Sequence, residues 1–509
     1  MRIAAKLGVA LLALAAIGLG LAGMLAPLRG LEVTKLAVGE VPALVYRQAG
    51  GGPAPAPAPV VVIAHGFAGS QQMMQPFATT LAQAGFVAVT FDFPGHGGNP
   101  TPLSGGLSDD QAASGALLGA LGRVVAAARP LGDGRLALLG HSMAADIVIR
   151  WAFDRPEVAA TVALSGFGPE VTATQPRNLL VGVGAWEPAF LQDAASRIVA
   201  LAAGGTPAAE TNYGDFAAGT ARRLVLVEGV EHIGILYARQ SLEEARAWFN
   251  AAFGRSGEGL VDTRGRSIGL LLGGLVALAA PLARLLPRAS VEPTGGGMPW
   301  RRFWWVAVLP AVATPLLLRL VPTGFLPILL GDYLAVHCGV YGVLTAATLG
   351  WAARGAAPTA GRAALPAVAL AALALAAYAI LGIGTAIDQF VLGFMPGPHR
   401  LWLVPVLLCG TLPWFLADEW ATRGPGAARL AYPATKALFL LSLLGAVALD
   451  PPRLFFLIII VPVMLLFLVV FGLFGRWSFR ATGSPVPAAI ANAVALAWAM
   501  AATFPIVPR

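Results

Sequence analysis

The sequence predicts an α/β domain with a doubly wound, mostly parallel sheet, preceded by a membrane anchor and followed by an all-α membrane domain. Short apolar strands alternate with helical stretches through the first half of the chain, as is typical of a parallel sheet covered on both faces. The chain of 509 residues is 57% hydrophobic and only 12% charged, with a mean hydropathy of +0.73. This composition excludes an ordinary soluble protein and predicts several membrane spans.

The first apolar stretch covers residues 7–27 and follows Arg2 and Lys6. It fits either a cleaved signal peptide or an uncleaved anchor, and its length of about 20 residues favours the anchor. In both cases the domain that follows is exported. We therefore expect an anchor or signal at 1–30, an α/β domain at 31–256 and a polytopic membrane domain at 257–509.

Within the α/β domain, residues 31–38 and 41–46 are predicted strands, and a Pro/Gly-rich loop follows at 49–59. Five further apolar strands begin near residues 60, 86, 136, 178 and 223. The predicted helices between and after them cover residues 70–84, 109–128, 142–153, 188–203 and 239–253.

The segment Gly140-His141-Ser142-Met143-Ala144 lies where an apolar strand ends and a helix begins. A serine on so short a turn is exposed at the carboxyl edge of the sheet, and the strained turn requires small residues two before and two after it. Gly140 and Ala144 meet this requirement, although the common pattern has glycine at the second position as well. The motif predicts a nucleophilic serine; the alternative is an ordinary serine in a strand-to-helix loop.

Two other strand ends support the nucleophile. The strand that starts at Val60 ends in His65-Gly66-Phe67, a turn that could aim the Phe67 backbone N–H at a developing oxyanion, with the Met143 N–H as second donor. The strand that starts at Phe86 runs into an Asp-x-x-Gly-His-Gly turn.

At these motifs the chain resembles the α/β-hydrolase superfamily over roughly residues 31 to 254. The resemblance implies a triad in the chain order serine, acid, histidine. It places the base at His232, in the loop after the strand at 223–229, and the acid at Glu187, after the penultimate strand. Asp193 and Asp215 are the alternative acids.

The second half of the chain predicts eight further spans, and its basic residues favour one side of the membrane. With the N-terminus inside, most arginines and lysines fall at inner ends, whereas the short outer loops hold only Arg319, Arg400 and Arg453. This bias places the α/β domain outside the cytoplasm. The predicted spans are 267–286, 303–321, 329–350, 364–387, 401–417, 434–449, 454–474 and 486–506. The inner charges are Arg2, Lys6, Arg284, Arg288, Arg301, Arg302, Arg354, Arg362, Arg423, Arg429, Lys436, Arg476 and Arg480.

Ionisable residues near these spans are expected mostly at span ends, as interfacial anchors. This applies to Asp332, Asp388, Asp418, Glu419 and Asp450, whereas His337 is the most embedded. An embedded ionisable group is a candidate for transport or proton relay, but histidine is also the easiest of them to bury neutral.

The predicted function is a membrane-anchored serine hydrolase that cleaves an ester or other acyl bond with Ser142, His232 and Glu187. We expect no metal or organic cofactor, an ester or acyl substrate that could be lipid-like, no nucleic-acid partner, and a location in a bacterial inner membrane. Cys338 and Cys409 lie in apolar segments and indicate no disulfide framework. The alternatives are an acyltransferase with the same triad, and a transport or assembly protein whose hydrolase-like domain binds a ligand or partner.

Overall fold

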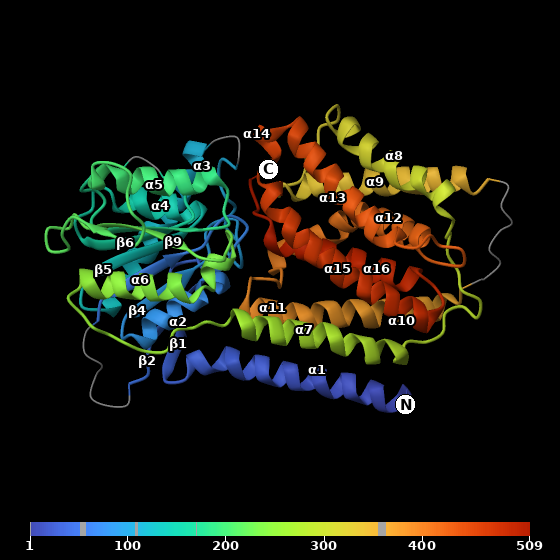
Figure 1. Cartoon of the computed structure of the whole chain (residues 1–509), viewed down its shortest axis with the longest axis horizontal. Coiled ribbons are helices and arrows are strands. Elements are labelled where there is room, and N and C mark those ends of the chain that lie inside the picture. Colours follow the sequence, from blue (N-terminus) through green and yellow to red (C-terminus); the bar gives the residue numbers. More distant parts are fainter. Residues whose placement is uncertain (1, 51–57, 107–109, 169–170, 355–362, 509) are drawn as a thin grey trace.

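A nine-stranded sheet lies at one end of the molecule, and long helices extend from it (Figure 1). The computed structural model describes residues 2–50, 58–106, 110–168, 171–354 and 363–508, so residues 51–57 of the predicted loop and Arg362 lie outside it. Within these ranges the strand order is β1-β2-β4-β3-β5-β6-β7-β9-β8. The strands are β1 Leu31–Lys35, β2 Ala43–Gln48, β3 Val60–Ala64, β4 Val87–Phe91, β5 Leu136–His141, β6 Val158–Leu164, β7 Leu179–Gly184, β8 Asn212–Tyr213 and β9 Arg222–Val227.

Helices cover both faces of this sheet. The run β4-β3-β5-β6-β7-β9 is parallel, and the strands at its two edges pair antiparallel. One face packs against α2 and α6, the other against α3, α4 and α5 (Figure 1). Every residue of β3, β4 and β5 is buried, which explains their continuous apolar sequences. The helices are α2 Gln75–Gln83, α3 Asp110–Ala128, α4 Met143–Ala152, α5 Ala189–Ala203 and α6 Arg239–Ala252. We call residues 31–254 the sheet domain.

The remaining helices form what we call the helical half. They are α1 Arg2–Leu25, α7 Gly265–Leu282, α8 Trp300–Leu318, α9 Gly331–Ala352, α10 Leu365–Ala377, α11 Thr385–Phe390, α12 Leu403–Thr422, α13 Ala431–Leu449, α14 Pro451–Leu454, α15 Leu457–Thr482 and α16 Val486–Thr503. The predicted fold class is confirmed: a mostly parallel sheet of α/β-hydrolase type, an N-terminal apolar helix and many long apolar C-terminal helices.

Eight helical stretches among the described residues are long and apolar enough to cross a membrane. One of them, Asp110–Leu131, contains α3 and packs on the sheet, so its apolar character serves the sheet domain. α8 and α12 fall outside this set, although α8 packs on α9 and α13, and α12 packs on α9 and α16. The apolar helices together indicate an integral membrane protein.

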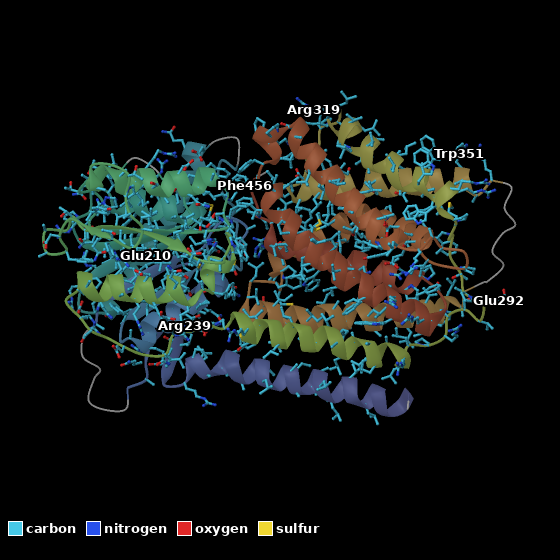
Figure 2. All side chains as sticks on the ribbon, in the orientation of Figure 1. Glu210, Arg239, Glu292, Arg319, Trp351 and Phe456 are labelled. Carbon is cyan, nitrogen blue, oxygen red and sulfur yellow. The ribbon has the colours of Figure 1, made fainter. Side chains whose placement is uncertain are left out.

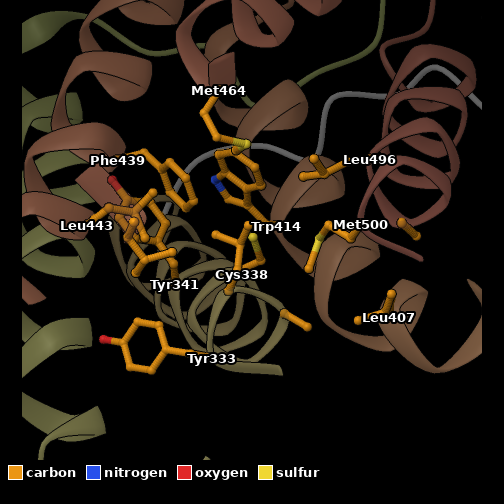
Figure 3. Packing of buried hydrophobic residues seen from close by; sticks show 14 of the residues in the cluster. Tyr333, Cys338, Tyr341, Leu407, Trp414, Phe439, Leu443, Met464, Leu496 and Met500 are labelled. Atoms are coloured by element: carbon orange, nitrogen blue, oxygen red, sulfur yellow. The ribbon is translucent and has the colours of Figure 1, made fainter. Parts of the chain in front are cut away.

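Aromatic and aliphatic side chains fill the centre of the helical half (Figure 3). The rings of Trp414 and Phe439 stack with centroids 3.8 Å apart, next to Tyr341. α9 and α12 approach so closely that a Cβ at Gly342 would lie 2.3 Å from the Trp414 backbone nitrogen. Small residues at such a crossing allow two helix backbones to touch, as in other membrane bundles.

Two acidic residues of α12 contradict the expectation of interfacial anchoring. The helix continues to Thr422, five residues past the predicted span, and therefore carries Asp418 and Glu419 within it. Both are buried, and they pair with Lys436 of α13 and with Arg423. Anchors at a membrane surface would be exposed to water, whereas these residues are ion pairs inside the bundle.

His337 is fully buried in α9, as the sequence indicates. Its Nε2 lies 3.1 Å from the Ser442 hydroxyl of α13. The histidine thus connects two helices by a hydrogen bond, which is enough to account for its position in the bundle.

The segment after α16 connects the helical half to the sheet domain. The predicted span at 486–506 is three residues too long, because α16 ends at Thr503 and the chain continues extended. The Ile506 N–H donates to the Gly95 carbonyl (2.9 Å) and the Leu103 N–H donates to the Ile506 carbonyl (2.8 Å). The chain end marked C in Figure 1 accordingly lies beside the sheet domain.

Arg400 reinforces the same junction. The sequence counts it among the charges of a short outer loop, but the structure buries it completely. Its guanidinium donates to the carbonyls of Ala501, Phe504 and Gly95. The arginine therefore holds the end of α16 against the turn that follows β4.

Candidate active site

Ser142 lies on a strained turn between β5 and α4. Its φ of 56° is in the left-handed region that residues other than glycine seldom adopt. A Cβ at Gly140 would lie 2.3 Å from the Ala144 carbonyl oxygen, so the residue two before the serine has to be glycine. The turn positions the serine hydroxyl at the carboxyl edge of the sheet, beyond the central strand β5.

His232 and Glu187 lie beside this serine in one hydrogen-bonded series. The His232 Nε2 is 2.9 Å from the Ser142 Oγ, and its Nδ1 is 2.7 Å from the Glu187 Oε2. Because a carboxylate only accepts, Nδ1 carries the proton, and Nε2 is free to accept from the serine hydroxyl. The histidine is held in the tautomer that a general base requires.

Glu187 is buried and heavily hydrogen-bonded. Its Oε1 accepts from the Ser165 hydroxyl (2.6 Å) and from the Gly184 N–H (2.9 Å). Burial by itself would raise the pKa of Glu187, but the hydrogen bonds from His232, Ser165 and the Gly184 N–H hold that pKa below its ordinary value. The carboxylate therefore remains ionised at neutral pH and can stabilise an imidazolium.

The two alternative acids occupy other places. Asp193 is exposed on α5, and the Asp215 carboxylate accepts a hydrogen bond from the Ala218 N–H in a surface turn. Sequence reasoning did not find Ser165, because β6, the strand that it follows, is not among the predicted strands. Among the described residues, the carboxylate within hydrogen-bond distance of His232 is that of Glu187.

Three buried histidines surround the site and support its loops. The His65 Nε2 accepts from the Phe93 N–H, so its Nδ1 donates to the Gly66 carbonyl and fixes the turn after β3. His141 donates from Nε2 to the His232 carbonyl (2.8 Å) and fixes the loop of the base. Burial lowers the pKa of His65 to about 4; burial and the nearby His232 lower that of His141 to about 3. Both are neutral near pH 7.

His96, in the turn after β4, completes this group. Its pKa is lowered to about 3 by burial and by the nearby His65. Because all three histidines stay uncharged near pH 7, none of them adds a positive charge beside Ser142.

Two backbone N–H groups flank the serine as expected oxyanion donors. Met143 is the first residue of α4, so its N–H has no acceptor within that helix and carries the positive end of the helix dipole. Phe67 lies in the turn after β3, directly after Gly66. A Cβ at Gly66 would lie 2.9 Å from the Ser142 Cβ, which shows how closely this turn approaches the serine.

Residues 55–197 match the family model described as Serine aminopeptidase, S33. No curated protein matches this chain. Several solved structures of low identity are similar. The protein TT1662 from Thermus thermophilus shares 15% identity, with 44% of this chain and 99% of that chain covered and a TM-score of 0.33. A membrane phospholipase A described as a bacterial virulence factor shares 14%, with 48% and 91% covered and a TM-score of 0.32. A predicted CIB-like hydrolase from Thermoplasma acidophilum shares 16%, with 43% and 98% covered and a TM-score of 0.31.

Proposed function

Because the chain carries an α/β-hydrolase domain, we propose that it is a membrane-anchored serine hydrolase that cleaves an ester or other acyl bond. The observation that carries this proposal is the double hydrogen bond of His232, to Ser142 on one side and Glu187 on the other. A domain that only binds a ligand or partner has no need of a serine, a correctly protonated histidine and a buried carboxylate in series.

In the proposed reaction the Ser142 oxygen attacks the carbonyl carbon and its proton passes to the His232 Nε2. The negative charge that develops on the carbonyl oxygen is stabilised by the N–H groups of Phe67 and Met143. His232 then donates its proton to the leaving alcohol or amine, and the acyl group stays on Ser142. A water molecule, deprotonated by His232, releases the acid and restores the serine.

Labelling by a fluorophosphonate tests the nucleophile directly. We expect the full-length protein to be labelled at Ser142, because among the described residues that hydroxyl is the one with both a base and an expected oxyanion site beside it. The Ser142→Ala variant should not be labelled, whereas Ser142 should still be labelled in the Ser165→Ala variant. Labelling of Ser142→Ala at the rate of the wild type would refute the proposal.

An acyltransferase would form the same acyl-enzyme and differ only in the acceptor. A transport or assembly protein would need its function in the helical half, where buried His337 and the two ion pairs are the residues that could serve it. The hydrolase is favoured because Ser142, His232 and Glu187 already form one hydrogen-bonded series, whereas the two buried ion pairs have partners that account for them structurally.

We propose that the sheet domain lies outside the cytoplasm of a bacterial cell. The residues at 284–302 and 354 belong to the ends of the helices far from the sheet, where Glu292 and Trp351 are labelled in Figure 2. Arginines gather at this end, as expected for a cytoplasmic face. Gly20 of α1 and Gly274 of α7 lie where these helices touch, which supports α1 as a retained anchor.

A topology reporter that works only outside the cytoplasm tests this orientation. Fused after Arg255, the reporter should be active, because the linker there follows an exported domain. Inserted between residues 288 and 301, it should be inactive. The reverse pattern would place the sheet domain inside the cell.

A further inference from the structure

A series of aromatic rings connects the candidate active site to the helical half. Phe67 stacks on Phe456, with ring centroids 4.9 Å apart, and Phe456 contacts Phe455 at 5.9 Å. Phe455 in turn contacts Phe190 of α5 at 6.4 Å, and Phe190 stacks on Phe167 at 6.1 Å. Figure 2 labels Phe456 where the sheet domain meets the helices. The rings therefore bridge the two parts of the molecule at the edge of the site.

The outer members of this series are open to solvent. Phe455 is 36% exposed, Phe190 46% and Phe167 44%. Phe190 follows the acid Glu187 by three residues, and Phe167 follows Ser165, which donates to that acid. Exposed rings gathered at one place are a common mark of a site that binds apolar ligands.

The same apolar surface continues down a membrane helix. Phe455 has helical φ and ψ and lies two residues before Leu457, the first residue of α15, which is the most hydrophobic of the candidate spans. Ile458, Leu465 and Val469 of α15 are exposed and lie at spacings that keep them on the helix face of Phe455. In a bilayer this face would contact lipid chains, and Phe455 joins it to the rings at the edge of the site.

We propose that the substrate is an acyl ester of a bilayer lipid, and that its acyl chain lies across Phe455 and Phe190 while Ser142 attacks the ester. This rests on the proposed hydrolase function of Ser142. The helical half then supplies part of the substrate site as well as the anchor. An acyl chain that stays on apolar surface between the bilayer and Ser142 is not exposed to water. Exposure to water would otherwise oppose the withdrawal of the acyl chain from the bilayer.

Two alkyl fluorophosphonates, one ethyl and one dodecyl, test the acyl site in the full-length protein in nanodiscs. In each case the Ser142 oxygen bonds to phosphorus, fluoride leaves and His232 takes the hydroxyl proton. We expect Phe455→Ala and Phe190→Ala each to lower the labelling rate by the dodecyl probe about tenfold, the loss expected when roughly half the burial of a phenyl ring is removed. The ethyl probe should label both variants at the wild-type rate.

Phe325→Ala is the matched control. Phe325 is also an exposed phenylalanine of the helical half, in the loop between α8 and α9, and it belongs to no part of the ring series. Both probes should label Ser142 of the Phe325→Ala variant at the wild-type rate. An equal effect of Phe455→Ala on the two probes, no effect on either, or the same dodecyl loss in Phe325→Ala would overturn the acyl site and leave the hydrolase standing. Failure of both probes to label wild-type Ser142 would refute the hydrolase itself.

Discussion

Ser142→Ala and His232→Ala are each expected to lower kcat for ester hydrolysis by roughly 10⁶-fold, to near background. The double variant should be little worse than either single one, because the serine and histidine act as one unit and removal of either stops the same proton transfer. Glu187→Gln should lose less, roughly 10⁴-fold, since the serine and the base remain while the tautomer of His232 is no longer enforced. Steady-state turnover of a short-chain ester by the purified full-length protein measures kcat for all four variants.

Asp193→Asn and Asp215→Asn are the controls for the acid. Each removes one carboxylate from the surface of the sheet domain without touching His232. Both should turn over the ester at the wild-type rate. A greater loss in either one than in Glu187→Gln would move the role of orienting acid away from Glu187.

Lys436→Met should destabilise the protein by about 3–5 kcal/mol, because it leaves the buried Asp418 carboxylate without its charged partner. The ammonium also lies over the rings of Tyr432 and Trp414, so that attraction disappears too. Thermal unfolding in detergent, followed by the loss of helical signal, would report the change.

The double variant Lys436→Met, Asp418→Leu separates charge from packing. Replacement of both partners leaves no buried charge, and most of the stability should return. Arg239→Met removes one partner of the exposed Arg239–Glu243 pair on α6 and should cost less than about 0.5 kcal/mol. If Lys436→Met lowered stability no more than Arg239→Met, the buried pair would not contribute as proposed.

Local patterns predicted most elements of the sheet domain, but not the strands β6 and β8. The predicted helix at 239–253 is observed as Arg239–Ala252, and the one at 188–203 as Ala189–Ala203. Parallel strands bring their carboxyl ends to one edge, and this geometry together with the resemblance to the α/β-hydrolase superfamily placed Ser142 and Glu187 near one another. Their catalytic roles remain a prediction for the kinetic experiments above.

Contacts between distant segments could not be predicted in this way. Arg400 has the appearance of an ordinary loop charge because its three carbonyl partners are about 100 residues or more away in the sequence. A span boundary drawn at the first charged residue puts Asp418 at a span end. In the structure α12 continues past Asp418, because Lys436 of α13 pairs with that carboxylate. Hydropathy does not record such pairing, so the junction of the two parts and the ring series emerged only from the structure.

The link between Ile506 and the Gly95 turn has a consequence for the order of events during synthesis. The sheet domain is complete by about residue 254, long before the segment that pairs with it leaves the ribosome. Until α16 is inserted, Arg400 lacks its Ala501 and Phe504 acceptors, and the Gly95 carbonyl lacks the Ile506 N–H. If the sheet domain folds before then, its Phe67 ring has no Phe456 to stack on until that later segment has been made. A nascent chain stalled before residue 455 would therefore carry Ser142 without the Phe455 and Phe456 rings that contact Phe190 and Phe67 in the complete protein.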